Sequence, residues 1–193
     1  MTSANGETSG IMFVSDDEIV AATRHWIDRA VVGLNLCPFA GRVFAEERIR
    51  YCVSRARSED ELLADLDVAL RRLHAADPAQ CETTLLIHPD VLEDFLDYND
   101  FLDVADAALD VLDLTQEIQI ASFHPRYQFA DTEADAVENC TNRSPYPILH
   151  LLRQSSIERV AATFSDAETI YEANMSTLRR LGVDGWRKLW LDP

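Results

Sequence analysis

Positive charge is scarce in this sequence of 193 residues. Lys and Arg number 17 against 34 Asp and Glu, which gives a formal net charge of -17. A field of that sign repels the phosphate backbone of nucleic acids and the anionic headgroups of lipids. We therefore expect neither nucleic acid nor a membrane as a partner. Arginines that gather in one place are informative, because they stand against the overall charge.

Long apolar runs and export signals are also missing. No run of about 18 apolar residues occurs, so we expect no helix that spans a bilayer. The first residues do not pair a basic stretch with an apolar one, as a secretory signal does. The cysteines are widely spaced and form no Cys-x-x-Cys pair, which predicts reduced thiols in a cytoplasmic protein. These cysteines are Cys37, Cys52, Cys81 and Cys140.

Several catalytic signatures are absent as well. The six glycines are scattered, so no glycine-rich loop is present to hold a phosphate. No Gly-x-Ser-x-Gly elbow points to a serine nucleophile. No two His or Cys residues have the close spacing typical of a metal site, so we expect no metal and the sequence indicates no particular cofactor.

The pattern of apolar residues predicts one α/β domain over residues 15–193, after a disordered tail at residues 1–14. Helices and strands alternate, and crossovers of that length join parallel strands. We therefore expect a small, mostly parallel sheet of three or more strands covered by helices; a ferredoxin-like α+β layer is the alternative. The expected strands are 48–54, 83–87 and 117–123, and the expected helices are 15–33, 58–75, 90–112, a helical segment from Ser144, and 166–181.

Two of the expected strands end in the same dipeptide, His88-Pro89 and His124-Pro125. In a parallel sheet both histidines would lie at the carboxyl edge, where open α/β sheets bind ligands. The alternative is that His88 and His124 are only polar residues at strand ends, each followed by a proline that ends the strand. His124 carries the stronger signal, because the next residues supply a guanidinium, a phenol and an amide (Arg126, Tyr127, Gln128).

A second arginine lies before the expected helix start at Ser144. Arg143 follows Asn142, and the free N–H groups of a helix start favour an anion. Arg126 and Arg143 would form a two-armed clamp for a carboxylate or phosphate, and His150 would lie two turns into the helix. The alternative is that the arginines pair with nearby carboxylates (Asp131, Glu133, Asp135).

Cys37 is the thiol with the clearest chemical interpretation. It precedes Pro38, a residue suited to a first helical turn, and a helix start lowers the pKa of a thiol. A nucleophilic or redox role would follow. The alternative is a buried, inert cysteine in an apolar turn.

Three strings of the sequence resemble a known family. They are residues 34–40 (LNLCPFA), 124–129 (HPRYQF) and 142–147 (NRSPYP). Together they are similar to a bacterial family called domain of unknown function 1415, and the likeness covers nearly the whole chain after residue 14. The resemblance implies a cytoplasmic protein of one domain, and it implies no activity, cofactor or catalytic residue.

These observations lead to one main hypothesis, a small-molecule enzyme or ligand-binding protein with an anion pocket at the strand ends. His124 would act as general acid or base, with Cys37 or His150 completing the site. The ligand-binding residues would be Arg126, Arg143, Asn142, Tyr127 and Gln128. This hypothesis predicts that Cys37, His124, Arg126, Arg143 and His150 converge on one pocket.

Two alternatives stay open beside that hypothesis. One is a protein-interaction module that uses the acidic helix faces and the Trp186/Trp190 segment, through which a homo-oligomer would also form. The other is a metal-binding protein with His and Cys ligands. Whether the protein is an enzyme does not follow from the sequence.

Overall fold

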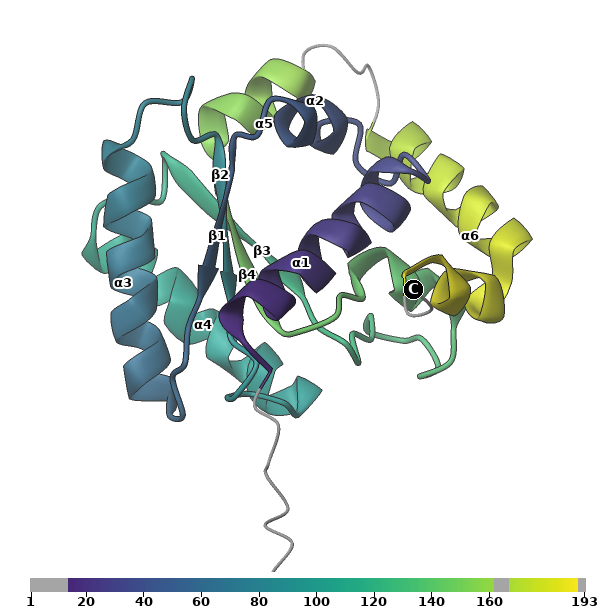
Figure 1. The fold of residues 1–193 in the computed structure, drawn as a ribbon, viewed down its shortest axis with the longest axis horizontal. Helices are drawn as coiled ribbons and strands as arrows, with labels where there is room; N and C mark the ends of the chain where they lie inside the picture. Colours follow the sequence, from purple (N-terminus) through teal and green to yellow (C-terminus); the bar gives the residue numbers. More distant parts are fainter. Residues whose placement is uncertain (1–13, 162–166, 191–193) are drawn as a thin grey trace, which may run out of the picture.

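The computed structural model describes residues 14–161 and 167–190, and it has a four-stranded sheet between two layers of helices (Figure 1). The expected tail at residues 1–14 lies outside the described residues except for Val14. The strands are β1 (Ile49–Val53), β2 (Thr83–Ile87), β3 (Ile118–Phe123) and β4 (Ile148–Arg153), in the spatial order β1-β2-β4-β3.

The sheet is mixed. β1 and β2 pair in parallel, whereas β4 runs antiparallel to both β2 and β3. It follows that β1, β2 and β3 point the same way and β4 points the opposite way. The prediction of a mostly parallel sheet is therefore wrong, since only β1 and β2 form a parallel pair. The order of elements, βαβαββ, also differs from the βαββαβ order of a ferredoxin-like layer.

The prediction of a helical segment from Ser144 is wrong, because this part of the chain forms the central strand β4. Its run Ile148-Leu149-His150-Leu151-Leu152 is apolar with no polar face, and periodicity cannot distinguish a buried helix from a strand buried on both sides. Ser144 does not cap a helix. Its hydroxyl instead donates to the carbonyl of Tyr146 at 2.6 Å.

One face of the sheet is covered by α3 (Glu59–Ala75) and α4 (Phe95–Val111) (Figure 1). Ser58 caps α3 as predicted. The next helix was expected from Asp90, but α4 begins at Phe95 with Asp94 as its cap. Leu92 has a φ of 58°. This left-handed conformation stops the helix from extending further back.

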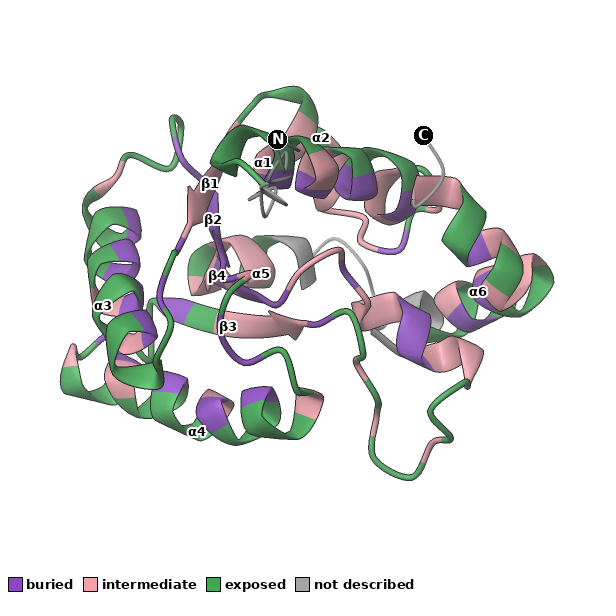
Figure 2. Ribbon diagram, turned by 60° about the horizontal axis from the view of Figure 1, so that its bottom comes forward, coloured by how far each residue is buried: buried purple, intermediate pink, exposed green. Residues whose placement is uncertain are grey.

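The other face carries the remaining helices (Figures 1 and 2). Ser15 and Glu18 form a capping box at the start of the first helix, where residue 15 was expected to begin it. The helix continues as a short π-helix, which is a local widening frequent at functional sites. The elements on this side are α1 (Asp16–Trp26), the π-helix η1 (Ile27–Val32), α2 (Ala40–Ala45), the 3-10 helix η2 (Val137–Asn142), α5 (Gln154–Ala161) and α6 (Ala167–Trp190).

The long helix α6 bends at Gly182, whose φ of 70° and ψ of 168° are non-helical. The sequence predicted a stop at this glycine, and the chain resumes a helix after it. Trp186 is buried in the core of its own chain, together with residues of α1 such as Ile19 and Trp26. The aromatic end of the chain therefore packs on the body, and its proposed role in a homo-oligomer stays a prediction.

Candidate functional site

The site is built on the sheet face that looks toward α1, η1 and α2. Side chains alternate between the faces of a strand, so residues in register lie beside one another on the same face. His150 of β4 is paired with Leu85 of β2 on one side and with Ala121 of β3 on the other. The other residues of this floor are Ile49, Thr83, Gln119, Phe123 and Leu152.

A cavity of about 1120 Å³ lies over this floor, and we call it the main cavity. Its opposite wall includes Trp26, Ile27 and Val31 of α1 and η1, followed by Cys37. Protein interiors are close-packed, with few voids larger than a water molecule. Ligand sites typically occupy about 300–1,000 Å³ and are lined mostly by apolar groups. The main cavity therefore has the size and lining of a small-molecule site.

His150 lies in the floor of the main cavity as a neutral imidazole. Its Nε2 is 2.7 Å from the hydroxyl oxygen of Thr83, and that hydroxyl donates its single proton to the carbonyl of Leu151 at 2.6 Å. The imidazole must therefore donate through Nε2, which leaves Nδ1 as an acceptor. Burial lowers the pKa of His150 to about 4. At neutral pH this residue offers a lone pair and no charge.

Cys37 lines the same cavity from the turn before α2. Burial raises the pKa of its thiol, and the backbone N–H groups of Phe39 and Ala40 oppose that rise only in part. The expected lowering of the thiol pKa by a helix start is not found. Desolvation of the thiolate is the larger effect, since α2 begins only at Ala40 and has one and a half turns.

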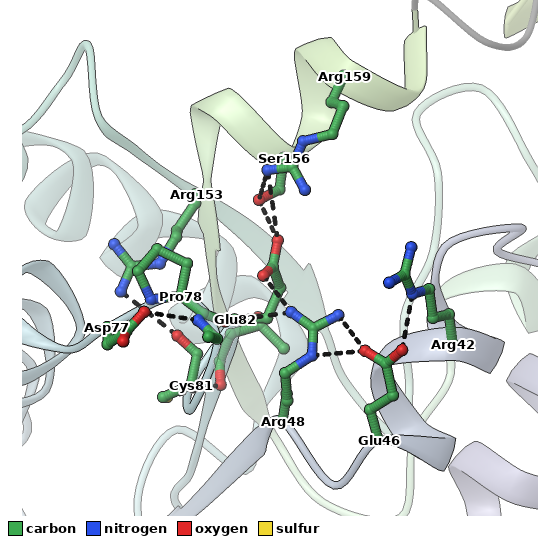
Figure 3. Close-up of polar contacts among 12 residues, drawn as sticks. Arg42, Glu46, Arg48, Asp77, Pro78, Cys81, Glu82, Arg153, Ser156 and Arg159 are labelled. Carbon is green, nitrogen blue, oxygen red and sulfur yellow. Dashed lines mark hydrogen bonds and ion pairs between the residues drawn. The ribbon is translucent and has the colours of Figure 1, made fainter.

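The cavity ends at a group of charged side chains, which we call the polar mouth and define as Arg42, Glu46, Arg48, Glu82, Ser156 and Arg159 (Figure 3). Arg48 is its centre. It contacts Glu46 at 2.6 Å through Nη2 and Glu82 at 2.6 Å through Nη1. Ser156 donates to the other oxygen of Glu82, and Arg42 contacts Glu46 at 2.8 Å.

The polar mouth lies at the amino ends of β1 and β2. Arg48 precedes β1 and Glu82 precedes β2, and the first residues of these strands, Ile49 and Thr83, are in register. The parallel pairing thus brings Arg48 and Glu82 together. Sequence reasoning missed this site because it looked for chemistry at the carboxyl ends. The signal was present as two opposite charges directly before two strands.

Positive charge exceeds negative charge around the main cavity. Four arginines line it against two glutamates, the fourth arginine being Arg153 at the end of β4. Hydrogen bonds from Arg42 and Arg48 lower the pKa of Glu46, which keeps that carboxylate ionised. A surplus of two positive charges in a chain of net charge -17 makes this region a local exception.

Two buried N–H donors of residues that line the main cavity have no partner within the described part of the chain. They are Nε1 of Trp26 and Nε of Arg153. Arg153 uses its Nη2 to hold three backbone carbonyls, of Leu73, Ala76 and Cys81. Unpaired buried donors of this kind lower the stability of the fold.

The carboxyl edge, where the site was expected, is packed closed. His124 is fully buried, and both of its ring nitrogens are engaged by backbone groups. Arg126 N–H donates to Nδ1 at 3.0 Å, so Nε2–H donates to the carbonyl of Leu92 at 3.2 Å. Burial lowers the pKa of His124. In this arrangement the ring fastens the turn before α4 to the sheet edge and leaves no nitrogen for a substrate.

His88 lies at the same edge, as expected, and both histidines contact Tyr98. The ring centroids of His88 and His124 are 5.7 Å and 5.1 Å from that of Tyr98. His88 Nδ1–H donates to the carbonyl of Val91 at 3.0 Å, and burial lowers the His88 pKa to about 4. The Tyr98 hydroxyl donates to the carbonyl of Ile148 and accepts from the N–H of Phe123. This cluster joins α4, β3 and β4.

The other residues of the expected clamp are distributed over this end of the molecule. Arg126 contacts the carbonyl of Glu93 and lies 3.6 Å from Asp94. Gln128 donates to the carbonyl of Thr132 at 2.6 Å, Asn142 donates to the carbonyl of Ser122 at 3.0 Å, and the Tyr127 ring packs against Phe95. Arg126 is thus held by an acidic neighbour, as the alternative interpretation foresaw, although by Asp94.

The structure therefore divides the predicted site residues. Cys37 and His150 line the main cavity, Arg143 lines a different cavity, and His124 and Arg126 line neither. These residues therefore do not converge on one pocket, contrary to expectation. Their chemical roles stay predictions. Within residues 14–161 and 167–190, no group of three or more His, Cys, Asp and Glu residues is placed to hold a metal ion, and no helix could cross a membrane.

Comparison with known proteins shows the family of this chain. No curated protein matches the chain, and no solved structure does. A family model described as "Protein of unknown function (DUF1415)" matches residues 18–188, a span that contains the whole sheet and both walls of the main cavity. The chain belongs to this family.

Proposed function

We propose that this protein binds a small amphipathic anion in the main cavity, as a ligand-binding protein or as an enzyme acting on such a molecule. The observation that carries the proposal is one cavity of about 1120 Å³ with an apolar floor at one end and surplus arginines at the other. An apolar body would contact the floor around Leu85, Ala121 and Phe123. The acidic group would lie at the polar mouth.

Electrostatics favour an anion over a neutral or cationic ligand. Glu46 and Glu82 each have arginine partners already, so a cationic ligand would have to compete with Arg42 and Arg48 for them. An anion instead meets guanidinium groups that exceed the carboxylates in number.

Any chemistry in the cavity would use neutral groups. His150 is uncharged and accepts through Nδ1, and Cys37 is a thiol whose raised pKa keeps it protonated. A hydroxyl or amide N–H of the ligand could donate to His150 without any proton transfer. These properties suit binding and orientation of a ligand better than acid catalysis by His150.

The test compares two fluorescent probes that differ in charge. Anilinonaphthalene sulfonate is an apolar body with an anionic group, and N-phenylnaphthylamine is nearly the same body without it. We expect both probes to bind in a saturable way, with the sulfonate the tighter. Ala121→Leu fills the floor and should weaken both at least about tenfold, because it removes the volume that they occupy.

A matched pair of arginine variants tests the polar mouth. Arg42 and Arg71 are both exposed arginines in i,i+4 ion pairs, with Glu46 and Asp67 respectively, and only Arg42 lines the cavity. Arg42→Gln should weaken the sulfonate roughly threefold and leave the neutral probe unchanged. Arg71→Gln should change neither. The proposal is overturned if Ala121→Leu binds each probe with the same affinity as the wild type.

A further inference from the structure

A second cavity, of about 460 Å³, lies between the segment that leads into β4 and the last turns of α6. We call it the arginine–tryptophan pocket and define it by Arg143, Tyr146, Trp186, Arg187 and Trp190. It shares no residue with the main cavity. It lies beside the carboxyl end of β3, because Pro125 also lines it.

Arg143 is held in place by backbone carbonyls, and no carboxylate of the described residues forms an ion pair with it. Its Nε donates to the carbonyl of Tyr127 at 3.2 Å, and its Nη2 donates to the carbonyl of Ala134 at 2.5 Å. These two bonds orient the guanidinium without using a carboxylate of the described residues. The acidic residues expected to pair with it do not do so, although Ala134 lies between Glu133 and Asp135.

Arg187 supplies a second guanidinium to the same pocket. Its side chain is exposed and forms no ion pair within the described part of the chain. Both arginines act on the sulfur of Cys140, where their positive charges oppose the rise in pKa that burial causes. Glu138 acts on the same sulfur in the opposite direction and is paired with Arg179. Arg143 and Arg187 both line this one pocket.

The remaining wall is aromatic. The ring centroids of Trp186 and Trp190 are 6.1 Å apart in an edge-to-face arrangement. Trp190 Nε1 is buried and has no hydrogen-bond partner within the described residues. None of the described residues that line the pocket is Asp or Glu. It thus combines flat apolar surfaces with two arginines that form no ion pair with the described residues.

We infer that the arginine–tryptophan pocket is a second binding site, for a small organic anion with a flat apolar body. A carboxylate or phosphate group would lie between Arg143 and Arg187. The ring of the ligand would pack on the indoles. This inference is independent of the proposed function, because different residues form the two cavities.

The test follows the indole N–H resonances of the three tryptophans by NMR, with Trp190→Phe to assign the signal of Trp190. The probes are benzoate, phenyl phosphate and benzyl alcohol, which carries a similar ring without charge. We expect benzoate or phenyl phosphate to shift the Trp190 signal in a saturable way, and benzyl alcohol to leave it in place. Which anion saturates at lower concentration shows whether the pocket favours a carboxylate or a phosphate.

Variants on one helical turn provide the control. Arg187→Gln removes a pocket cation and should weaken anion binding roughly tenfold. Lys188→Gln removes the same charge from an exposed neighbour outside the pocket and should have little effect. Ala121→Leu, which fills the main cavity, should leave the Trp190 shift intact. The inference fails if neither anion gives a saturable shift, or if Lys188→Gln weakens binding as much as Arg187→Gln.

Discussion

The two ends of the sheet have opposite properties. At the carboxyl ends of β2 and β3, His88 and His124 are fully buried around Tyr98. At the amino ends of β1 and β2, Arg48 and Glu82 border a large cavity. The rule that places ligands at carboxyl ends applies to open sheets with parallel strands and a topological switch point. Here β4 is inserted in the antiparallel direction, and its pairing closes that end.

The comparison shows what a histidine at a strand end can mean. His124 has both nitrogens bound to backbone groups, whereas His150 in mid-strand keeps one nitrogen as an acceptor in the main cavity. His124 has the more suggestive sequence context, yet it is the histidine whose two ring nitrogens are both occupied. The residue that faces a cavity was expected on a helix.

The largest expected effect comes from Tyr98→Phe at the closed end. The change removes the hydroxyl that donates to the buried carbonyl of Ile148 and accepts from the partly buried N–H of Phe123, and it leaves both groups without this partner. We expect the free energy of unfolding to fall by about 2–3 kcal/mol. Urea denaturation measures this loss, and probe binding in the main cavity should be retained. Unchanged stability would show that the hydrogen bonds of the Tyr98 hydroxyl at this end of the sheet do not stabilise the fold.

Arg48→Gln should have the next largest effect, at the other end of the sheet. The side chain of Glu82 is only 8% exposed, and this change removes its closest cationic partner. We expect a loss of about 2 kcal/mol in the free energy of unfolding, because a poorly solvated carboxylate is left with weaker partners. Glu82→Gln in the same background should recover part of the loss. A double-mutant cycle in urea denaturation measures that recovery, and its absence would contradict the pairing.

The smallest effect is the part of the pH dependence that His88 contributes, beside the similar part that His150 contributes in the main cavity. The pKa of His88 is lowered from 6.5 to about 4, so below pH 6.5 the unfolded chain binds a proton that the folded chain does not. Stability should therefore fall as the pH drops from 7 toward 4, with about 1 kcal/mol of the loss due to His88 by pH 5.5. His88→Asn should flatten this part of the profile. Parallel profiles for the two proteins would contradict the assignment.

Local signals in the sequence predicted the peripheral elements well. Ser15, Ser58 and Gly182 mark helix ends in the structure because capping and left-handed glycine are determined by a few neighbouring atoms. The strand 83–87 was predicted from its apolar run and has those limits. Family membership also followed from short strings, and the family model confirms it.

What the sequence did not reveal depends on pairing between distant residues. β4 resembles a buried helix until β2 and β3 are known to lie on either side of it. The polar mouth requires the register of β1 against β2, which brings Arg48 next to Glu82. The main cavity requires in addition that a small residue, Ala121, lies beside His150. Such facts are non-local, so no window along the chain contains them.

The central position of β4 has a consequence for folding. β4 is the last strand of the sheet in the chain, yet it lies between two strands that are made before it. Its pairing with β2 joins residues such as Leu85 and His150, so a long loop must close before the sheet is complete. Until β4 pairs, the strand that carries His150 is missing from the floor of the main cavity. The Tyr98 hydroxyl also lacks the Ile148 carbonyl to which it donates. The protein should thus regain ligand binding only when β4 has paired. During refolding, the recovery of ligand binding and the completion of the sheet should therefore have the same rate.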